Sequence, residues 1–253
     1  MDRRSLILEK AQRTGRVMVD DLAQEFGVST HTIRRDINVL CEQAKLRRLH
    51  GGAEFIDGSA NLPYAMRAIL NANAKTAIAT KVASLIPDEA TVFISIGTTP
   101  AMVAAELADK NGLTVITNNL NAAMAVAQNT THRIILPGGE LRLPDRDMIN
   151  LAAIRLFEGY RADFGIYGVG GIDPDGSLLD FHEEEVQIRQ QIHGNAHQSI
   201  LVADKTKFGR RAAAVGGHLN EADFMVIDDR PEGDFSNQLD DYSGQLIVAR
   251  EEA

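Results

Sequence analysis

Residues 28–37 read Val28-Ser29-Thr30-His31-Thr32-Ile33-Arg34-Arg35-Asp36-Ile37, and their spacing determines how the amino-terminal part of the chain folds. At about 100° per residue on a helix, Ile33, Ile37 and Leu40 lie on one side. The pattern therefore predicts a helix from Thr30 to Gln43, capped by Ser29, whose apolar side packs inward. The opposite side carries side chains that suit guanine edges, adenine edges and phosphates, namely His31, Arg34, Arg35 and Asn38.

Two shorter helical patterns precede this helix. Leu6 to Gln12 is followed by a stop at Gly15, and Val19 to Phe26 is followed by a stop at Gly27. The short turn Gly27-Val28-Ser29 between the second and third patterns is typical of a helix-turn-helix.

A basic hairpin is predicted directly after the third helix. Leu46-Arg47-Arg48-Leu49-His50 and Ala53-Glu54-Phe55-Ile56 are short extended runs separated by Gly51-Gly52, which is a turn signal. Residues 1–57 therefore read as a winged helix-turn-helix domain that binds double-stranded DNA, with a solvated basic helix face as the alternative interpretation. The expected DNA contacts are Ser29, Thr30, His31, Thr32, Arg34, Arg35, Asn38, Arg47, Arg48, His50, Gly51 and Gly52.

Charge separates the chain into two parts. Residues 1–53 hold ten Lys/Arg and seven Asp/Glu, a net charge of +3, whereas the remaining residues of the 253-residue chain carry −12. This asymmetry predicts a basic module attached to an acidic domain. A single cysteine excludes an internal disulfide and a Cys-rich zinc site, and no apolar run approaches the roughly 20 residues of a membrane span. We expect a cytoplasmic protein without a membrane partner, a metal or a cofactor.

Strands and helices alternate after a connector over residues 58–73. Short apolar strands, each followed by a helix, predict a mostly parallel sheet covered on both faces in a domain spanning residues 74–253. The expected strands are Thr91–Ile96, Leu113–Thr117, Arg133–Leu136, Phe164–Val169, Ser199–Ala203, Phe224–Ile227 and Gln245–Ala249. The expected helices are Ala74–Leu85, Pro100–Ala108, Asn121–Gln128, Leu151–Phe157 and Glu183–Ala196.

Small and polar residues follow several of these strands. Gly97-Thr98-Thr99-Pro100 leads into a helix, and free backbone N–H groups beside two hydroxyls would form an anion cradle there. Ligands bind at the carboxyl ends of strands in open α/β sheets, so the loops should converge on one site, although each alone could be plain turn chemistry. The expected ligand contacts are Gly97, Thr98, Thr99, Asn118, Asn119, Gly138, Gly139, Glu140, Gly168, Gly171, Asp180 and Lys207. The lysine and the hydroxyls would hold a phosphate, and Asn118, Asn119, Glu140 and Asp180 would bind hydroxyl groups.

Two motifs resemble the DeoR family of bacterial repressors. They are S-x-x-T-I-R-R-D, from Ser29 to Asp36, and H-G-G-A, from His50 to Ala53. The later loops also match the order of that family's sensor domain, with Ser95 where the family usually has Asp. The resemblance implies a Rossmann-like α/β sensor domain similar to ribose-5-phosphate isomerase. It further implies a repressor of a glycerol or sugar-phosphate regulon that leaves its operator when glycerol 3-phosphate or a sugar phosphate binds.

Two other functions stay open at this point. The chain could be a sugar-phosphate isomerase or deaminase with a fused DNA-binding module, or a repressor of another phosphosugar regulon. We favour a repressor without catalytic residues. It should form a homo-oligomer, a dimer or a tetramer, because one small module makes few contacts to DNA.

Overall fold

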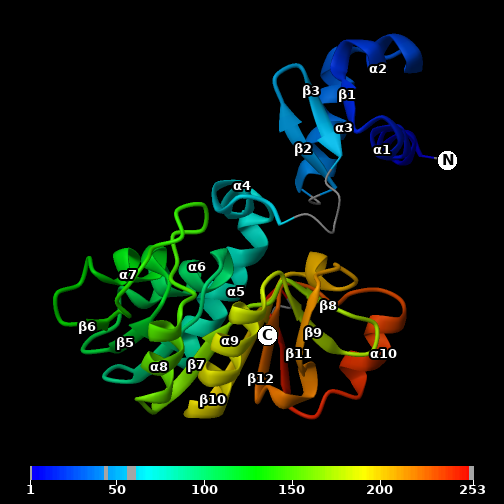
Figure 1. The fold of residues 1–253 in the computed structure, drawn as a ribbon. Helices are drawn as coiled ribbons and strands as arrows, with labels where there is room; N and C mark the ends of the chain where they lie inside the picture. Colours follow the sequence, from blue (N-terminus) through cyan, green and yellow to red (C-terminus); the bar gives the residue numbers. More distant parts are fainter. Residues whose placement is uncertain (1, 43–44, 56–60, 251–253) are drawn as a thin grey trace. The chain divides into compact units, whose positions relative to one another are not determined.

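The chain folds into two compact units (Figure 1). A computed structural model describes residues 2–42, 45–55 and 61–250. The first unit covers residues 1–62 and 69–71, and the second covers residues 63–68 and 72–253.

The first unit combines three helices with a small antiparallel sheet of order β1-β3-β2. Its elements are α1 (Arg3–Thr14), β1 (Arg16–Met18), α2 (Val19–Phe26), α3 (Thr30–Glu42), β2 (Leu46–Leu49) and β3 (Gly52–Phe55). Ile7, Leu22, Ile33 and Ile37 are fully buried at its centre. The predicted helices and basic hairpin are confirmed, except that Gln43 and Ile56, at the ends of the predicted third helix and hairpin, lie outside the described residues. Strand β1, which pairs with β3, was not expected.

The second unit is built on a seven-stranded, fully parallel sheet of order β13-β12-β10-β7-β4-β5-β6. Its strands are β4 (Thr91–Ile94), β5 (Thr114–Thr117), β6 (Arg133–Ile135), β7 (Ala162–Tyr167), β10 (Ala196–Ala203), β12 (Phe224–Ile227) and β13 (Gln245–Val248). All seven expected strands take part, so the predicted α/β architecture is confirmed.

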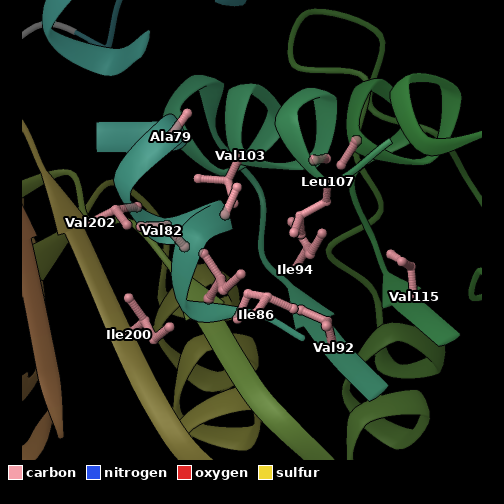
Figure 2. Close-up of a cluster of buried hydrophobic side chains, with 14 of the residues drawn as sticks. Ala79, Val82, Ile86, Val92, Ile94, Val103, Leu107, Val115, Ile200 and Val202 are labelled. Carbon is pink, nitrogen blue, oxygen red and sulfur yellow. The ribbon is translucent and has the colours of Figure 1, made fainter. Parts of the chain in front are cut away.

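Helices cover both faces of this sheet. Side chains alternate along each strand, so Val92 and Ile94 pack on one face while Phe93 packs on the other. The first face is covered by α5 (Ala72–Leu85), α6 (Thr98–Leu107) and α7 (Leu120–Val126). The second is covered by α8 (Leu151–Glu158), α9 (Glu183–Asn195) and α10 (Asp234–Asp240). Figure 2 shows side chains of α5 and α6 lying among those of β4 and β10 in the first core.

Some elements carry no clear signal in the sequence. A second antiparallel sheet of order β11-β9-β8 joins β8 (Gly171–Ile172), β9 (Ser177–Asp180) and β11 (Ala214–His218). Short 3-10 turns, η1 (Lys205–Lys207) and η2 (Leu219–Glu221), follow β10 and β11. Helix α4 (Tyr64–Ile69) lies within the segment expected to be a connector, and its Arg67 pairs with Asp145 of the second unit. None of the helices in the described ranges is long and apolar enough to cross a membrane.

The order of the strands places a topological switch point in the second unit. The chain runs outward from β4 to β5 and β6, and then returns to β7 on the other side of β4. The carboxyl ends of β4 and β7 therefore flank the point where the strand order reverses. Ligands of open α/β sheets bind at such a point.

Candidate functional site

Helix α3 presents a polar face on the first unit. Ile33, Ile37 and Leu40 on its other side are at most 2% exposed. His31, Arg34, Arg35 and Asn38 are all exposed, as the helical spacing predicted. Neither Arg34 nor Arg35 forms an ion pair with any described residue. Both guanidinium groups therefore keep their hydrogen-bond donors available for base edges or phosphates.

The hairpin formed by β2 and β3 lies beside α3. Arg48 donates from Nη1 to Oδ1 of Asn38 at 3.0 Å, which links the hairpin to the polar face of the helix. Arg47 pairs with Glu54 directly across the hairpin, so part of its charge is already balanced. His50 is exposed at the turn. Arg48 and His50 are thus better placed than Arg47 to meet a phosphate backbone.

Several of the expected DNA contacts have a structural role in the module. Ser29 caps α3, because its Oγ accepts from the backbone N–H of Thr32 at 3.2 Å and lies 2.9 Å from the Thr32 hydroxyl. Gly51 has a φ of +75°, which the tight turn requires. A Cβ on buried Gly52 would lie 2.2 Å from the carbonyl oxygen of Val17, so this glycine permits the close approach of β1. Thr30, at the first position of α3, is half-buried.

Loops that follow three adjacent strands lie close together at the carboxyl edge of the sheet in the second unit. Gly97 follows β4 with a φ of +114° and leads into Thr98 and Thr99, which begin α6 and are 7% and 5% exposed. A Cβ on Gly168, after β7, would lie 3.6 Å from both Pro100 and the carbonyl oxygen of Val202 in β10. The start of α6, the loop after β7 and the end of β10 therefore lie together, as the sequence predicted.

Lys207 sits in a group of cations at this edge. Burial, and next Arg210, lower the pKa of Lys207 to about 7, with Lys75 and Arg67 contributing further repulsion. Burial also lowers the pKa of Lys75, which is 4% exposed, to about 8. Burial alone would raise the pKa of Asp204, but Lys207 and Lys75 hold it below its usual value. Four cations thus share one region, and their positive charge suits an anionic ligand.

Arg210 connects this group to the glycine-rich loop after β7. Its Nη1 donates to the carbonyl oxygen of Gly170 at 3.2 Å, and its guanidinium lies 4.9 Å from the ring centre of Phe181. A Cβ on Gly171 would come within 1.9 Å of the Arg210 carbonyl oxygen. Gly171 is therefore needed so that the chain around Arg210 can pack against this loop.

Asp180 is fully engaged in holding the same loop. Its carboxylate is 6% exposed, accepts from the backbone N–H of Gly170 at 3.0 Å and pairs with Nε of Arg189 at 2.9 Å. Burial raises the pKa of this carboxyl group, and Arg189 opposes that shift. These bonds suit a residue that positions the loop better than one that binds ligand hydroxyl groups.

The two asparagines after β5 have different roles. Asn119 donates from Nδ2 to the carbonyl oxygens of Ser95 at 3.2 Å and Gly97 at 3.0 Å, and its Oδ1 caps α7. It therefore fixes the loop that begins α6. Asn118 donates to the carbonyl oxygen of Met148 at 2.9 Å, but its buried Oδ1 accepts no hydrogen bond among the described residues. That oxygen is available for a hydroxyl donor.

The loop with Gly138, Gly139 and Glu140 follows β6, the edge strand of the sheet. Gly139 has a φ of +104°, and its close neighbour is the side chain of Asn150. Glu140 is exposed. The strand that precedes this loop is two strands away from β4 in the sheet. Its neighbour Asn150 does not belong to the group of cations around Lys207.

The sequence analysis did not include three members of the group of cations around Lys207 among the expected ligand contacts, namely Arg67, Lys75 and Arg210. Lys75 did carry a signal, because it shares the buried side of α5 with Ile78, Ala79 and Val82. A lysine on the apolar side of a helix is costly unless it serves a polar site. Arg210 ends the segment Asp204–Arg210 that contains Lys207 and follows a strand, so its position also carried a signal. Arg67 lies in no motif, and the fold alone places it there.

The amino-terminal edge of the sheet has different chemistry. A hollow there is lined by Asp88, Glu89, Asp163 and His197, among others. The acidic lining disfavours an anion. No group of three or more residues that could hold a metal occurs in the described parts of the chain.

Comparison with known proteins adds the family context. Residues 3–59 match the DeoR-like helix-turn-helix domain and residues 70–229 match the DeoR C-terminal sensor domain. The glycerol-3-phosphate regulon repressor of Escherichia coli (strain K12) is 41% identical over 240 residues, 95% of each chain. The repressor of that name from Haemophilus influenzae is 39% identical over 246 residues, 97% of this chain and 96% of the relative. Ribose 5-phosphate isomerase A from Neisseria gonorrhoeae is 13% identical with a TM-score of 0.39, and the match covers 54% of this chain and 53% of the isomerase.

Proposed function

This chain belongs to the DeoR family of transcriptional repressors, and we propose that it leaves its operator when a phosphate ester binds at the cations around Lys207. It is a DNA-binding repressor with a small-molecule sensor domain, and not an enzyme, since its relatives are repressors over nearly their whole length. We place its action in the cytoplasm, on double-stranded operator DNA.

Charge balance supports a phosphate monoester as the ligand. Lys75, Arg210, Arg67 and the protonated form of Lys207 supply four positive charges, and the carboxylates of Asp204 and Asp145 offset two of them. A phosphate monoester carries nearly two negative charges at neutral pH. Its oxygens would also accept from the N–H groups and hydroxyls of Thr98 and Thr99.

Glycerol 3-phosphate is our first candidate for the ligand. The relatives that are 39–41% identical to this chain are named for the glycerol-3-phosphate regulon. The open acceptor of Asn118 suits a ligand hydroxyl. A sugar phosphate is the second candidate for the ligand, in which case the protein would repress another phosphosugar regulon.

Operator binding calls for more than one copy of the chain. One winged helix-turn-helix makes too few contacts for tight specific binding, and a two-fold dimer matches two half-sites. We therefore propose that the repressor acts as a homodimer or homotetramer.

The test is a comparison of Lys207→Ala with Lys81→Ala, which removes an exposed lysine from α5. Fluorescence anisotropy would measure binding to a promoter fragment while glycerol 3-phosphate or a sugar phosphate is added. We expect Lys207→Ala to bind DNA with wild-type affinity and to keep that affinity when the phosphate ester is added. Lys81→Ala should lose DNA affinity with added phosphate ester as the wild type does. A Lys207→Ala protein that still leaves the DNA at the wild-type ligand concentration would contradict the proposed site.

A further inference from the structure

Helix α4 is a short helix held in place from both ends. Its first turn is closed by Pro63, whose carbonyl oxygen accepts from the backbone N–H groups of Met66 at 3.0 Å and Arg67 at 3.1 Å. At the other end, the ammonium group of Lys75 donates to the carbonyl oxygen of Arg67. Isolated helices of this length are unstable in water, so α4 depends on such tertiary contacts.

The side chain of Arg67 provides a further attachment. Its guanidinium pairs with Asp145 and lies 6.0 Å from the ring centre of Tyr64. Asp145 is itself 3.6 Å from Arg142, which bonds to Asp147 and Glu185 at 2.8 Å each. Arg67 is therefore tied to an ion network that reaches α9, and the buried Nε of Arg67 has no acceptor among the described residues.

Lys75 belongs to two groups at once. It bonds to α4, and it also lies within electrostatic reach of Asp204 and Arg210 in the group of cations around Lys207. A phosphate dianion placed among those cations attracts the ammonium group far more strongly than a neutral carbonyl oxygen does. The bound ligand and the end of α4 thus compete for Lys75.

Helix α4 adjoins the DNA-binding unit in the chain, so a change in α4 can reach that unit. Residues 63–68, which hold all of α4 except Ile69, belong to the second unit and follow directly on residue 62 of the DNA-binding unit, to which residues 69–71 also belong. A ligand changes DNA affinity only if it interacts unequally with two states of the protein. An ordered and a released α4 are two such states.

We propose that Lys75 couples the sensor to the DNA-binding unit by exchanging the Arg67 carbonyl oxygen for the phosphate of the effector, which releases α4. The proposal rests on the proposed function, because it requires a phosphate ester at this site. Asp145 holds α4 through Arg67 and is not a ligand contact. Loss of its charge should therefore loosen α4 without removing any group that binds the phosphate.

The test compares Asp145→Asn with Asp240→Asn, which breaks an exposed ion pair with Arg230. Glycerol 3-phosphate, and inorganic phosphate in parallel, would be titrated by calorimetry without DNA and by anisotropy with a promoter fragment. We expect the wild type and Asp240→Asn to lose DNA affinity by a factor in the usual range of about 5–150. Asp145→Asn should bind glycerol 3-phosphate at least as tightly as the wild type. Its DNA affinity should be low already without the ligand and should change by less than about twofold when the ligand is added.

Hydrogen exchange in residues 64–69 provides an independent measurement. We expect ligand to speed exchange in the wild type, and exchange in Asp145→Asn to be fast before any ligand is added. If Asp145→Asn leaves DNA by the full wild-type factor, or if ligand slows exchange in α4, the coupling role is overturned while the proposed function stands. A wild-type protein that does not respond to any phosphate ester overturns both.

Discussion

The Nε atom of Arg3 donates to the carboxylate of Asp36 at 2.6 Å, which fastens the start of α1 to the buried side of α3. Arg4 approaches the other carboxylate oxygen at 3.3 Å. Burial would raise the pKa of Asp36, which is 4% exposed, but the two arginines hold it below its usual value. The orientation of the helix that carries Arg34 and Arg35 therefore depends on a buried carboxylate.

Asp36→Asn should weaken operator binding, because α3 loses the anchor that sets its angle. Anisotropy with a promoter fragment measures the effect, and Asp20→Asn on α2 is the matched control because Asp20 is exposed. Removal of a negative charge from the module should by itself strengthen binding to DNA. The two variants should therefore shift affinity in opposite directions, and equal strengthening by both would contradict a positioning role.

Arg34→Ala and Arg35→Ala should each weaken specific operator binding by about 1–3 kcal/mol if the arginine binds a base edge. Titrations at several salt concentrations separate base contacts from phosphate contacts, since a lost phosphate contact mainly lowers the salt dependence. Arg155→Ala, which removes an exposed arginine from α8, is the control. Wild-type affinity in both Arg34→Ala and Arg35→Ala would exclude α3 as the recognition helix.

Periodicity was enough to predict the main elements of both units. The apolar spacing of Ile33 and Ile37 on α3 and the buried strands of the parallel sheet are local signals. The small sheet of the second unit is different, because β8 has two residues and β11 contains Gly216 and Gly217. Pairing between β9 and β11 depends on segments more than 30 residues apart. Local sequence patterns carry no information about such a contact.

The candidate effector site was also predictable only in part, because some of its residues follow local rules and others are placed by tertiary packing. Gly97 and Lys207 follow strands, so the rule that ligands bind at the carboxyl ends of strands located them. Asp180 also lies at the carboxyl end of a strand, but in the fold its carboxylate accepts a hydrogen bond from Arg189. Arg67 reaches the site from α4, which precedes the first strand of the sheet. Side-chain partners are set by tertiary packing, and no spacing in the chain could reveal them.

Asp180→Asn should lower the free energy of unfolding of the second unit by about 3–5 kcal/mol, because it leaves Arg189 buried without a charge partner. Denaturant unfolding measures this loss. Asp229→Asn is the control, since its pair with Lys205 is half-exposed and should be worth less than about 1 kcal/mol. Unchanged stability together with lost effector affinity would instead make Asp180 a ligand contact.

Effector affinity should have a maximum near pH 7. The pKa of Lys207 is lowered to about 7 by burial and by Arg210, so above that pH the site must take up a proton before its lysine attracts a phosphate. Affinity then falls by up to about tenfold per pH unit for each proton bound. Below about pH 6 the phosphate ester itself loses a negative charge, and affinity falls again.

Lys207→Arg separates these two effects, because a guanidinium stays charged throughout this range. Its fall in affinity at high pH should begin about one unit later, near the pKa of about 8 that burial gives Lys75. Calorimetry in two buffers with different ionisation enthalpies measures the protons taken up at each pH. For the wild type we expect net proton uptake on binding at pH 8, whereas equal affinity at pH 7 and pH 9 would show that neither lysine binds the phosphate.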